Sequence, residues 1–141
     1  MKRSASAVWQ GDLKGGKGEI SSDSGALKST QYSFSTRFEN GIGTNPEELI
    51  AAAHAACFAM ALSAQLGAAG ITPQRIDAKA TVTLDKLEGG WTVTESHLEV
   101  KAKIPGGDRA AFDKAANDAK AGCPISKLLK ANITMNASLE A

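Results

Sequence analysis

Two cysteines, Cys57 and Cys123, are the residues of this 141-residue chain with the most distinctive chemistry. Two are too few for the disulfide framework of a small secreted domain, but enough for one redox-active pair. Cys57 lies among alanines, where a free cysteine commonly serves as a small buried hydrophobe. Cys123 precedes Pro124 at a predicted helix start, where the positive end of the helix dipole lowers a thiol pKa. The pair indicates thiol chemistry, with simple packing as the alternative for each residue.

A reactive Cys57 needs a cation from another part of the chain, because a thiol in mid-helix gains nothing from its own helix dipole. Arg37 is the leading candidate, and the alternative is an exposed charge at a strand end. We expect Glu47 to hold the Arg37 guanidinium through two parallel hydrogen bonds, although acids are also common in a first helical turn for dipole reasons.

Residues 47 and 57 are ten positions apart on one predicted helix, which corresponds to about 15 Å along its axis. Glu47 and Cys57 of one chain are therefore not expected to share a site. Two such helices packed antiparallel in a dimer would bring each Glu47 beside the other chain's Cys57, which is a hypothesis at this point.

His54 lies three residues before Cys57 on the same helical face, which raises a Cys–His nucleophile as a possibility. A core or interface histidine is favoured, because the sequence places no orienting carboxylate beside it. His97 is the only other histidine, and the cysteines and histidines lack the close spacing of a zinc site. The glycine-rich stretches 15–18 and 105–107 lack the spacing of a phosphate-binding loop and are interpreted as turns.

The longest apolar stretch, Leu49 to Ala64, follows the strongest helix-start signal of the chain. Asn45 is a suitable cap, Pro46 suits the first helical position, and two acids follow in the first turn. The pattern predicts a helix of about 22 residues, ending near Gly67–Gly70. It is apolar on nearly every face, so it belongs inside the protein or between two copies of it. The stretch is short and alanine-rich for a membrane span, and we expect none.

The remaining elements are strand-like segments and two further helices. Turn residues separate them, and no linker is long enough to divide the chain, so we expect one α+β domain over residues 1–141, with antiparallel β-meanders and one long helix. The predicted strands are 5–10, 17–22, 32–38, 77–84, 90–94, 97–104 and 132–139, and the predicted helices are 108–121 and 124 to about 130.

Composition excludes several classes of function. The chain has 16 basic and 15 acidic residues and a net charge of +1, so it offers no electrostatic footprint for nucleic acid. An apolar content of 43% argues against disorder, and 5% aromatic content requires a largely aliphatic core. Residues 1–7 contain two basic residues and no following apolar run, so a cytoplasmic location is the default expectation.

Two segments together carry a family resemblance: NPEELIAAAHAACF, residues 45–58, and AGCPIS, residues 121–126. They resemble the osmotically inducible protein C branch of the thiol-dependent peroxidases, a family that also contains the organic hydroperoxide resistance proteins. The segments TRFE, residues 36–39, and WQGDL, residues 9–13, support the resemblance, which covers essentially the whole chain. The four active-site positions of the family are all matched.

The resemblance implies an intertwined homodimer of α+β subunits, in which antiparallel β-meanders wrap around a long central helix and the active sites lie at the dimer interface. Carried over by residue, Cys57 would be peroxidatic, Cys123 resolving, and Arg37 with Glu47 the activating pair. The substrates implied are organic hydroperoxides and hydrogen peroxide, reduced through a Cys57 sulfenic acid and a Cys57–Cys123 disulfide. No flavin, haem or metal is required, and lipoylated proteins or small dithiols would be the reductants.

Three apolar side chains, those of Phe38, Phe58 and Met60, are candidates for receiving the organic part of a hydroperoxide, with core packing as the favoured role for any one of them. Two other functions stay open. One is a Cys57–His54 thioester or acyl hydrolase, which would not need the second cysteine. The other is a non-catalytic lipid-binding dimer with inert thiols.

Overall fold

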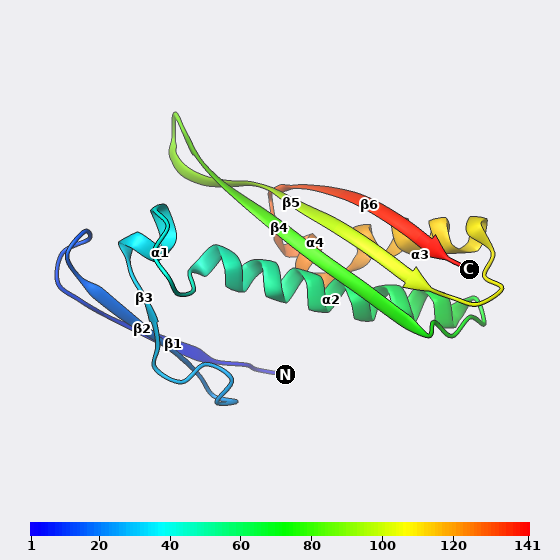
Figure 1. The fold of residues 1–141 in the computed structure, drawn as a ribbon, viewed down its shortest axis with the longest axis horizontal. Helices are drawn as coiled ribbons and strands as arrows, with labels where there is room; N and C mark the ends of the chain where they lie inside the picture. Colours follow the sequence, from blue (N-terminus) through cyan, green and yellow to red (C-terminus); the bar gives the residue numbers. More distant parts are fainter. The chain divides into compact units, whose positions relative to one another are not determined.

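The computed structural model describes residues 1–141, which form two compact units, residues 1–49 and 50–141. The first unit begins with an antiparallel sheet of β1 (Ala5–Gln10), β2 (Lys17–Ser22) and β3 (Thr30–Tyr32), drawn in blue to cyan in Figure 1. The first two strands have the predicted bounds. Gly18 faces Trp9 in the register of β1 and β2, and a Cβ at Gly18 would overlap the Tyr32 ring. A glycine at this position lets the Trp9 and Tyr32 rings pack with their centroids 5.5 Å apart.

The predicted strand 32–38 is wrong, because β3 ends at Tyr32 and a short helix, α1 (Phe34–Phe38), follows. Ser33 caps this helix: its side chain accepts a hydrogen bond from the Thr36 N–H, and its own N–H donates to Thr36 Oγ1 at 2.9 Å. The alternating aromatic and polar residues imitate a strand, whereas this reciprocal cap favours a helical turn. Arg37 therefore lies on a helix and not at a strand end.

The long helix α2 (Pro46–Ala68) has 23 residues, close to its predicted length. Asn45 caps it as predicted, since the Glu48 N–H donates to Asn45 Oδ1 at 2.8 Å. In the second unit one stripe of the helix is fully buried, at four-residue spacing: His54, Phe58, Leu62 and Leu66. The other side chains of α2 are more exposed to solvent, and that of Met60 is 77% exposed. By length and composition alone α2 is also apolar enough to cross a membrane, a property shared by core helices of soluble proteins.

The second sheet consists of β4 (Arg75–Leu87), β5 (Gly90–Lys103) and β6 (Asn132–Glu140). Strands β4 and β5 form a long antiparallel hairpin with one irregularity at Thr83/Leu84. The two strands predicted at 90–94 and 97–104 are one continuous strand, β5. The second predicted meander is thus an antiparallel hairpin, and the final strand β6, for which no direction was predicted, pairs parallel to β5. This direction follows from the helical crossover between the two strands.

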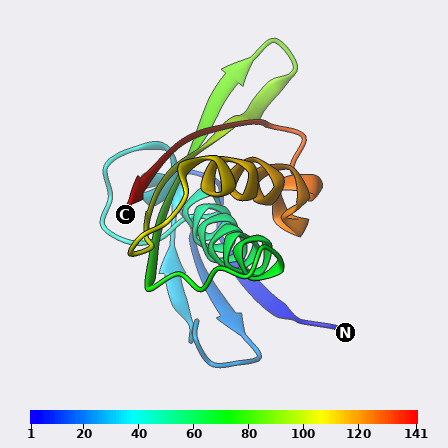
Figure 2. The same cartoon turned by 90° about the vertical axis from the view of Figure 1, so that its right-hand side faces the viewer.

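The crossover contains α3 (Arg109–Gly122) and α4 (Pro124–Leu128), close to their predicted bounds. Asp108 caps α3 by accepting a hydrogen bond from the Ala111 N–H at 3.2 Å. Figure 2 shows α2 and α3 beside the sheet of the second unit. The core contains residues from α2, β5 and α3, including Phe58, Leu98 and Phe112. The α+β class with two small sheets and a long helix is as predicted.

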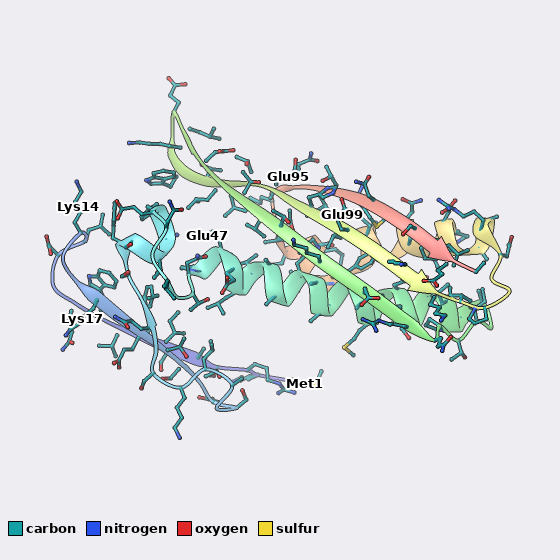
Figure 3. All side chains as sticks on the ribbon, in the orientation of Figure 1. Met1, Lys14, Lys17, Glu47, Glu95 and Glu99 are labelled. Atoms are coloured by element: carbon teal, nitrogen blue, oxygen red, sulfur yellow. The ribbon has the colours of Figure 1, made fainter.

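The two faces of β5 differ sharply in polarity. Leu98, Val100 and Ala102 are buried against the helices, whereas alternate residues on the other side are polar. Figure 3 labels two of these, Glu95 and Glu99. Ser96 breaks the pattern, because it is polar and yet fully buried on the core side.

Candidate active site

Arg37 and Glu47 form a bidentate ion pair within the first unit. Arg37 Nε donates to Glu47 Oε1 at 2.8 Å, and Arg37 Nη2 donates to Glu47 Oε2 at 3.2 Å. Asn45 Nδ2 donates to the Thr36 carbonyl at 2.9 Å, which ties the start of α2 to α1. The Glu47 side chain, labelled in Figure 3, is 11% exposed and that of Arg37 is 37% exposed. The carboxylate thus holds the guanidinium in a fixed orientation while part of it stays accessible.

An aromatic pocket lies directly beside this guanidinium. It is a hollow of about 250 Å³ within the first unit, lined by Trp9, Leu13, Tyr32, Ser33, Phe34, Arg37 and Phe38. Arg37 Cζ is 5.2 Å from the centroid of the Phe38 ring. Phe38 thus lies in an apolar pocket, as considered from the sequence, whereas Phe58 is fully buried in the core of the second unit. The pocket combines apolar walls with a single cation.

Cys57 and Cys123 meet within the second unit although 66 residues separate them. Cys57 is half-buried on α2, and Cys123 is fully buried at the start of α4. Their Sγ atoms are 2.8 Å apart, and both cysteines are free thiols. The crossover through α3 and α4 brings the second thiol onto the long helix. Two thiols at this distance are in a position to exchange a proton and to close a disulfide.

The two thiols have opposite tendencies to ionise. Burial raises the pKa of Cys57, and the adjacent Cys123 raises it further, against a smaller opposing effect of the Ile125 N–H. Burial also disfavours the Cys123 thiolate, but the Cys57 thiol and the N–H groups of Ser126 and Ile125 outweigh it and lower the Cys123 pKa. The direction for Cys123 agrees with its predicted place at a helix start. The causes of the Cys57 pKa shift are burial, Cys123 and the Ile125 N–H, and none of them is a cation.

His54 is completely buried, with a hydroxyl at each ring nitrogen. Nδ1 is 2.6 Å from Ser96 Oγ, and Nε2 is 2.7 Å from Ser126 Oγ. Burial lowers the His54 pKa, which keeps the ring neutral at neutral pH. Because both nitrogens are occupied by hydroxyls, the ring is not arranged as a base for Cys57, and the core interpretation of His54 holds. Sequence reasoning missed both serines, although Ser96 interrupts an apolar strand face and Ser126 follows Cys123 by three residues.

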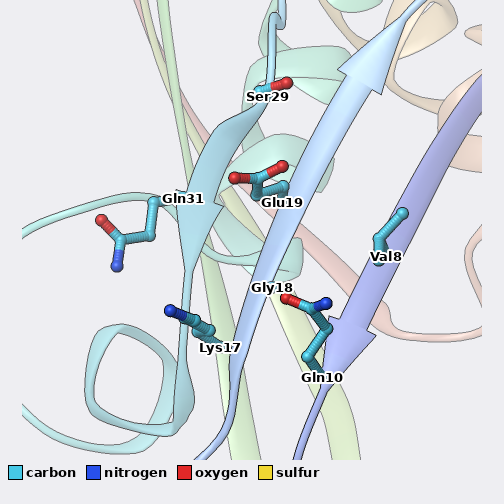
Figure 4. A pocket seen from close by; sticks show the side chains of 7 residues that line it. All are labelled: Val8, Gln10, Lys17, Gly18, Glu19, Ser29 and Gln31. Carbon is cyan, nitrogen blue, oxygen red and sulfur yellow. The ribbon is translucent and has the colours of Figure 1, made fainter.

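Two further observations delimit the candidate site. A second hollow, on the sheet of the first unit, is lined by Val8, Gln10, Lys17, Gly18, Glu19, Ser29 and Gln31 (Figure 4). It carries one cation and one carboxylate and contains no cysteine or histidine. No group of three or more histidine, cysteine or acidic side chains is arranged to hold a metal ion. The candidate site is therefore built on the thiol pair and the Arg37–Glu47 pair.

Comparison with known proteins places the chain among its relatives. A family model described as OsmC-like protein matches residues 39–138. Peroxiredoxin OsmC of Escherichia coli is 51% identical over 140 residues, which cover 99% of this chain and 98% of that protein. The crystal structure of the organic hydroperoxide resistance protein OhrB of Bacillus subtilis matches with a TM-score of 0.73 at 29% identity, over 96% of this chain and 97% of that one. An OsmC-like protein from Mycoplasma pneumoniae shares the fold, with a TM-score of 0.77 at 17% identity over 100% of this chain and 99% of that one. The chain therefore belongs to the OsmC-like protein family.

Proposed function

We propose that this protein is a thiol-dependent peroxidase that reduces organic hydroperoxides, and also hydrogen peroxide, in defence against oxidative or osmotic stress. Its similarity to a peroxiredoxin and to organic hydroperoxide resistance proteins supports this activity. The observation that carries the proposal is the pair of free thiols with Sγ atoms 2.8 Å apart. No resident cofactor takes part, because both electrons of each turnover come from the two thiols.

In the first step the Cys57 thiolate attacks the terminal oxygen of the hydroperoxide. The O–O bond breaks, Cys57 becomes a sulfenic acid, and the other oxygen leaves as an alkoxide that takes a proton to become the alcohol. Arg37 stabilises the thiolate and the charge that develops on the leaving oxygen, and Glu47 keeps the guanidinium oriented. The aromatic pocket beside Arg37 receives the organic group.

In the second step the Cys123 thiolate attacks the sulfenic sulfur of Cys57. The Cys57–Cys123 disulfide forms, and the departing hydroxide takes a proton to become water. The lowered Cys123 pKa supports its role as the resolving thiol, since a larger fraction is thiolate near neutral pH. An external dithiol, such as a lipoyl group on a partner protein, then reduces the disulfide by exchange.

The working unit in this proposal is a cytoplasmic homodimer, with residues 1–141 of each chain acting as one domain. Arg37 and Glu47 of one chain serve Cys57 of the other, which satisfies the need of Cys57 for a cation. The open, apolar side of α2 supports the dimer, because a second copy would cover it. Sedimentation should give a dimer, and Met60→Glu should dissociate it, whereas Gln74→Glu, which adds a charge at an exposed polar position, should not. A monomeric wild-type protein would contradict the intersubunit site.

The enzymatic test is the consumption of cumene hydroperoxide with dihydrolipoamide as reductant. Cys57→Ser should lose essentially all turnover. Cys123→Ser should still consume about one equivalent of peroxide and then stall or turn over only slowly, because the external dithiol must then reduce the Cys57 sulfenic acid directly. Full activity in Cys57→Ser would refute the proposal. Hydrolysis of a thioester by Cys123→Ser at the wild-type rate would favour the hydrolase instead, and inert thiols in the wild-type protein would favour a lipid-binding dimer.

A further inference from the structure

A chain of buried polar groups runs from β5 through α2 to the resolving thiol. Ser96 Oγ contacts His54 Nδ1, and His54 Nε2 contacts Ser126 Oγ. The Ser126 side chain in turn interacts with Cys123, whose Sγ is 2.8 Å from that of Cys57. Ser96 and His54 are 0% exposed and Ser126 is 8% exposed. The chain ends at the reacting sulfurs, yet the two chemical steps described above do not use it.

The protons of this chain allow two arrangements, because a neutral imidazole has one N–H donor and one acceptor nitrogen. In the first, Ser96 donates to Nδ1 and Nε2–H donates to the Ser126 oxygen. The Ser126 O–H is then free to donate to the Cys123 sulfur. In the second arrangement every bond is reversed, and the Ser126 O–H points at His54. Only the first adds the Ser126 hydroxyl to the donors that Cys123 already has in the Cys57 thiol and the N–H groups of Ser126 and Ile125.

The charge on the sulfur decides between the two arrangements. A buried thiolate strongly favours any donor it can reach, since a hydrogen bond to a charged group is about twice as strong as one between neutral groups. A sulfur in a disulfide is a weak acceptor and exerts no such preference. His54 stays neutral throughout, because its burial lowers its pKa. The Nε2–H tautomer of His54 is therefore the one that matches an ionised Cys123.

We propose that the buried Ser96–His54–Ser126 relay directs the Ser126 hydroxyl toward the Cys123 thiolate, and thereby sets the rate at which Cys123 resolves the oxidised Cys57. This inference rests on the proposed peroxidase function. His54 is a positioning residue: it acts through Ser126 and takes no proton from the reacting atoms. The step it assists is the attack of Cys123 on the Cys57 sulfenic acid, in which the disulfide forms and water leaves.

The kinetic test separates the two steps in a single turnover. Reduced protein is mixed with one equivalent of cumene hydroperoxide, quenched at intervals in acid, and weighed by mass spectrometry. Oxidation of Cys57 adds one oxygen, and closure of the disulfide then leaves the chain two hydrogens lighter than the reduced protein. We expect Ser126→Ala and His54→Leu to slow closure about ten- to a hundredfold, the loss of one hydrogen bond to a charged sulfur, while peroxide reacts within twofold of the wild-type rate.

Conservative variants distinguish the relay from a purely structural role. Ser126→Thr keeps the hydroxyl, and His54→Gln keeps an amide donor near the position of Nε2, so both should restore most of the closure rate. His97→Gln, which alters the other histidine of the chain, is the matched control and should close normally. If Ser126→Ala closes within twofold of wild type while peroxide still oxidises Cys57, the relay is wrong and the peroxidase stands. If peroxide fails to oxidise Cys57 in the wild-type protein, both proposals are wrong.

The tautomer of His54 provides a test that needs no variant and no turnover. Nitrogen-15 NMR of the reduced wild-type protein distinguishes a protonated Nε2 from a protonated Nδ1. We expect the Nε2–H tautomer at a pH at which Cys123 is ionised. A protonated Nδ1 under those conditions would overturn the relay, because Ser126 would then donate to His54 and not to the sulfur.

Discussion

The two compact units carry different halves of the proposed chemistry. The first unit holds the Arg37–Glu47 pair and the aromatic pocket, but contains no cysteine. The second unit holds both thiols and the buried His54, but no cation contributes to the Cys57 pKa there. Each half is organised by its own hydrogen bonds. This division predicts that substrate activation and disulfide closure can be disturbed separately: changes in the first unit should affect the reaction with peroxide, and changes in the second unit, Cys57 itself excepted, should affect disulfide closure or stability.

Arg37→Met gives the largest effect expected in the first unit. Loss of the guanidinium removes the charge that stabilises the Cys57 thiolate and the leaving oxygen, so the rate constant with cumene hydroperoxide should fall about a hundredfold or more. Stopped-flow peroxide consumption measures it. Arg75→Met is a matched control, because Arg75 also binds a carboxylate, that of Asp77, through two nitrogens. Equal losses in the two variants would contradict a specific role for Arg37.

Glu47→Gln should have a smaller effect on the same step. The amide keeps the size of the side chain but loses the charge that holds the guanidinium through two bonds, so the peroxide rate should fall about tenfold. Glu48→Gln is the control on the next residue, since the Glu48 side chain accepts a hydrogen bond from Thr44 Oγ1 and does not contact Arg37 in the Arg37–Glu47 pair. If disulfide closure slows in Glu47→Gln while the peroxide step is unchanged, the division between the units is wrong.

Phe38→Ala tests the pocket by comparing two substrates. Removing the ring takes apolar surface from the wall beside Arg37, so the value of kcat/KM for cumene hydroperoxide should fall about five- to tenfold. Hydrogen peroxide has no organic group and should be reduced within twofold of the wild-type rate. A parallel loss for both peroxides would show that the pocket does not select the organic part.

The smallest of the expected effects is a loss of folding stability at acidic pH, and it arises from His54 in the second unit. Because burial lowers the His54 pKa below 6.5, the unfolded chain binds more protons than the folded one as pH falls through that value. The free energy of unfolding should therefore decrease below about pH 6.5, by up to about 1.4 kcal/mol per pH unit. Urea titrations at several pH values should show this slope, His54→Gln should flatten it, and His97→Gln should keep it. A slope that survives in His54→Gln would assign it to another group.

Local signals predicted most of the fold. The Asn45 cap, the following proline and acids, and the long apolar run place α2 within a few residues, and turn residues place β1 and β2. The strand predicted for residues 34–38 was wrong, because their alternating aromatic and polar side chains imitate a strand while the Ser33–Thr36 cap favours a helix. The direction of β6 also escaped prediction, since sheet pairing depends on how the crossover packs and not on a local pattern.

In the candidate site, too, contacts between residues distant in the sequence could not be predicted from local patterns. Residue types and spacing, together with the family resemblance, led to both cysteines, Arg37 and Glu47 as site candidates, and the structure pairs Cys57 with Cys123 and Arg37 with Glu47. The Ser96–His54–Ser126 chain was not predicted, because three residues from β5, α2 and α4 meet only in the folded core. A single serine on an apolar strand face does not indicate a hydrogen-bond network until its partner in the folded core is known.

The measurement that tests the central claim most directly is peptide mapping of the protein after one turnover. Reduced protein receives one equivalent of cumene hydroperoxide without reductant, is alkylated and digested, and its cross-linked peptides are sequenced by mass spectrometry. We expect a mass loss of two hydrogens and one disulfide that joins Cys57 to Cys123 within a single chain. Two alkylated cysteines, or a disulfide that joins the Cys57 residues of two chains, would contradict it.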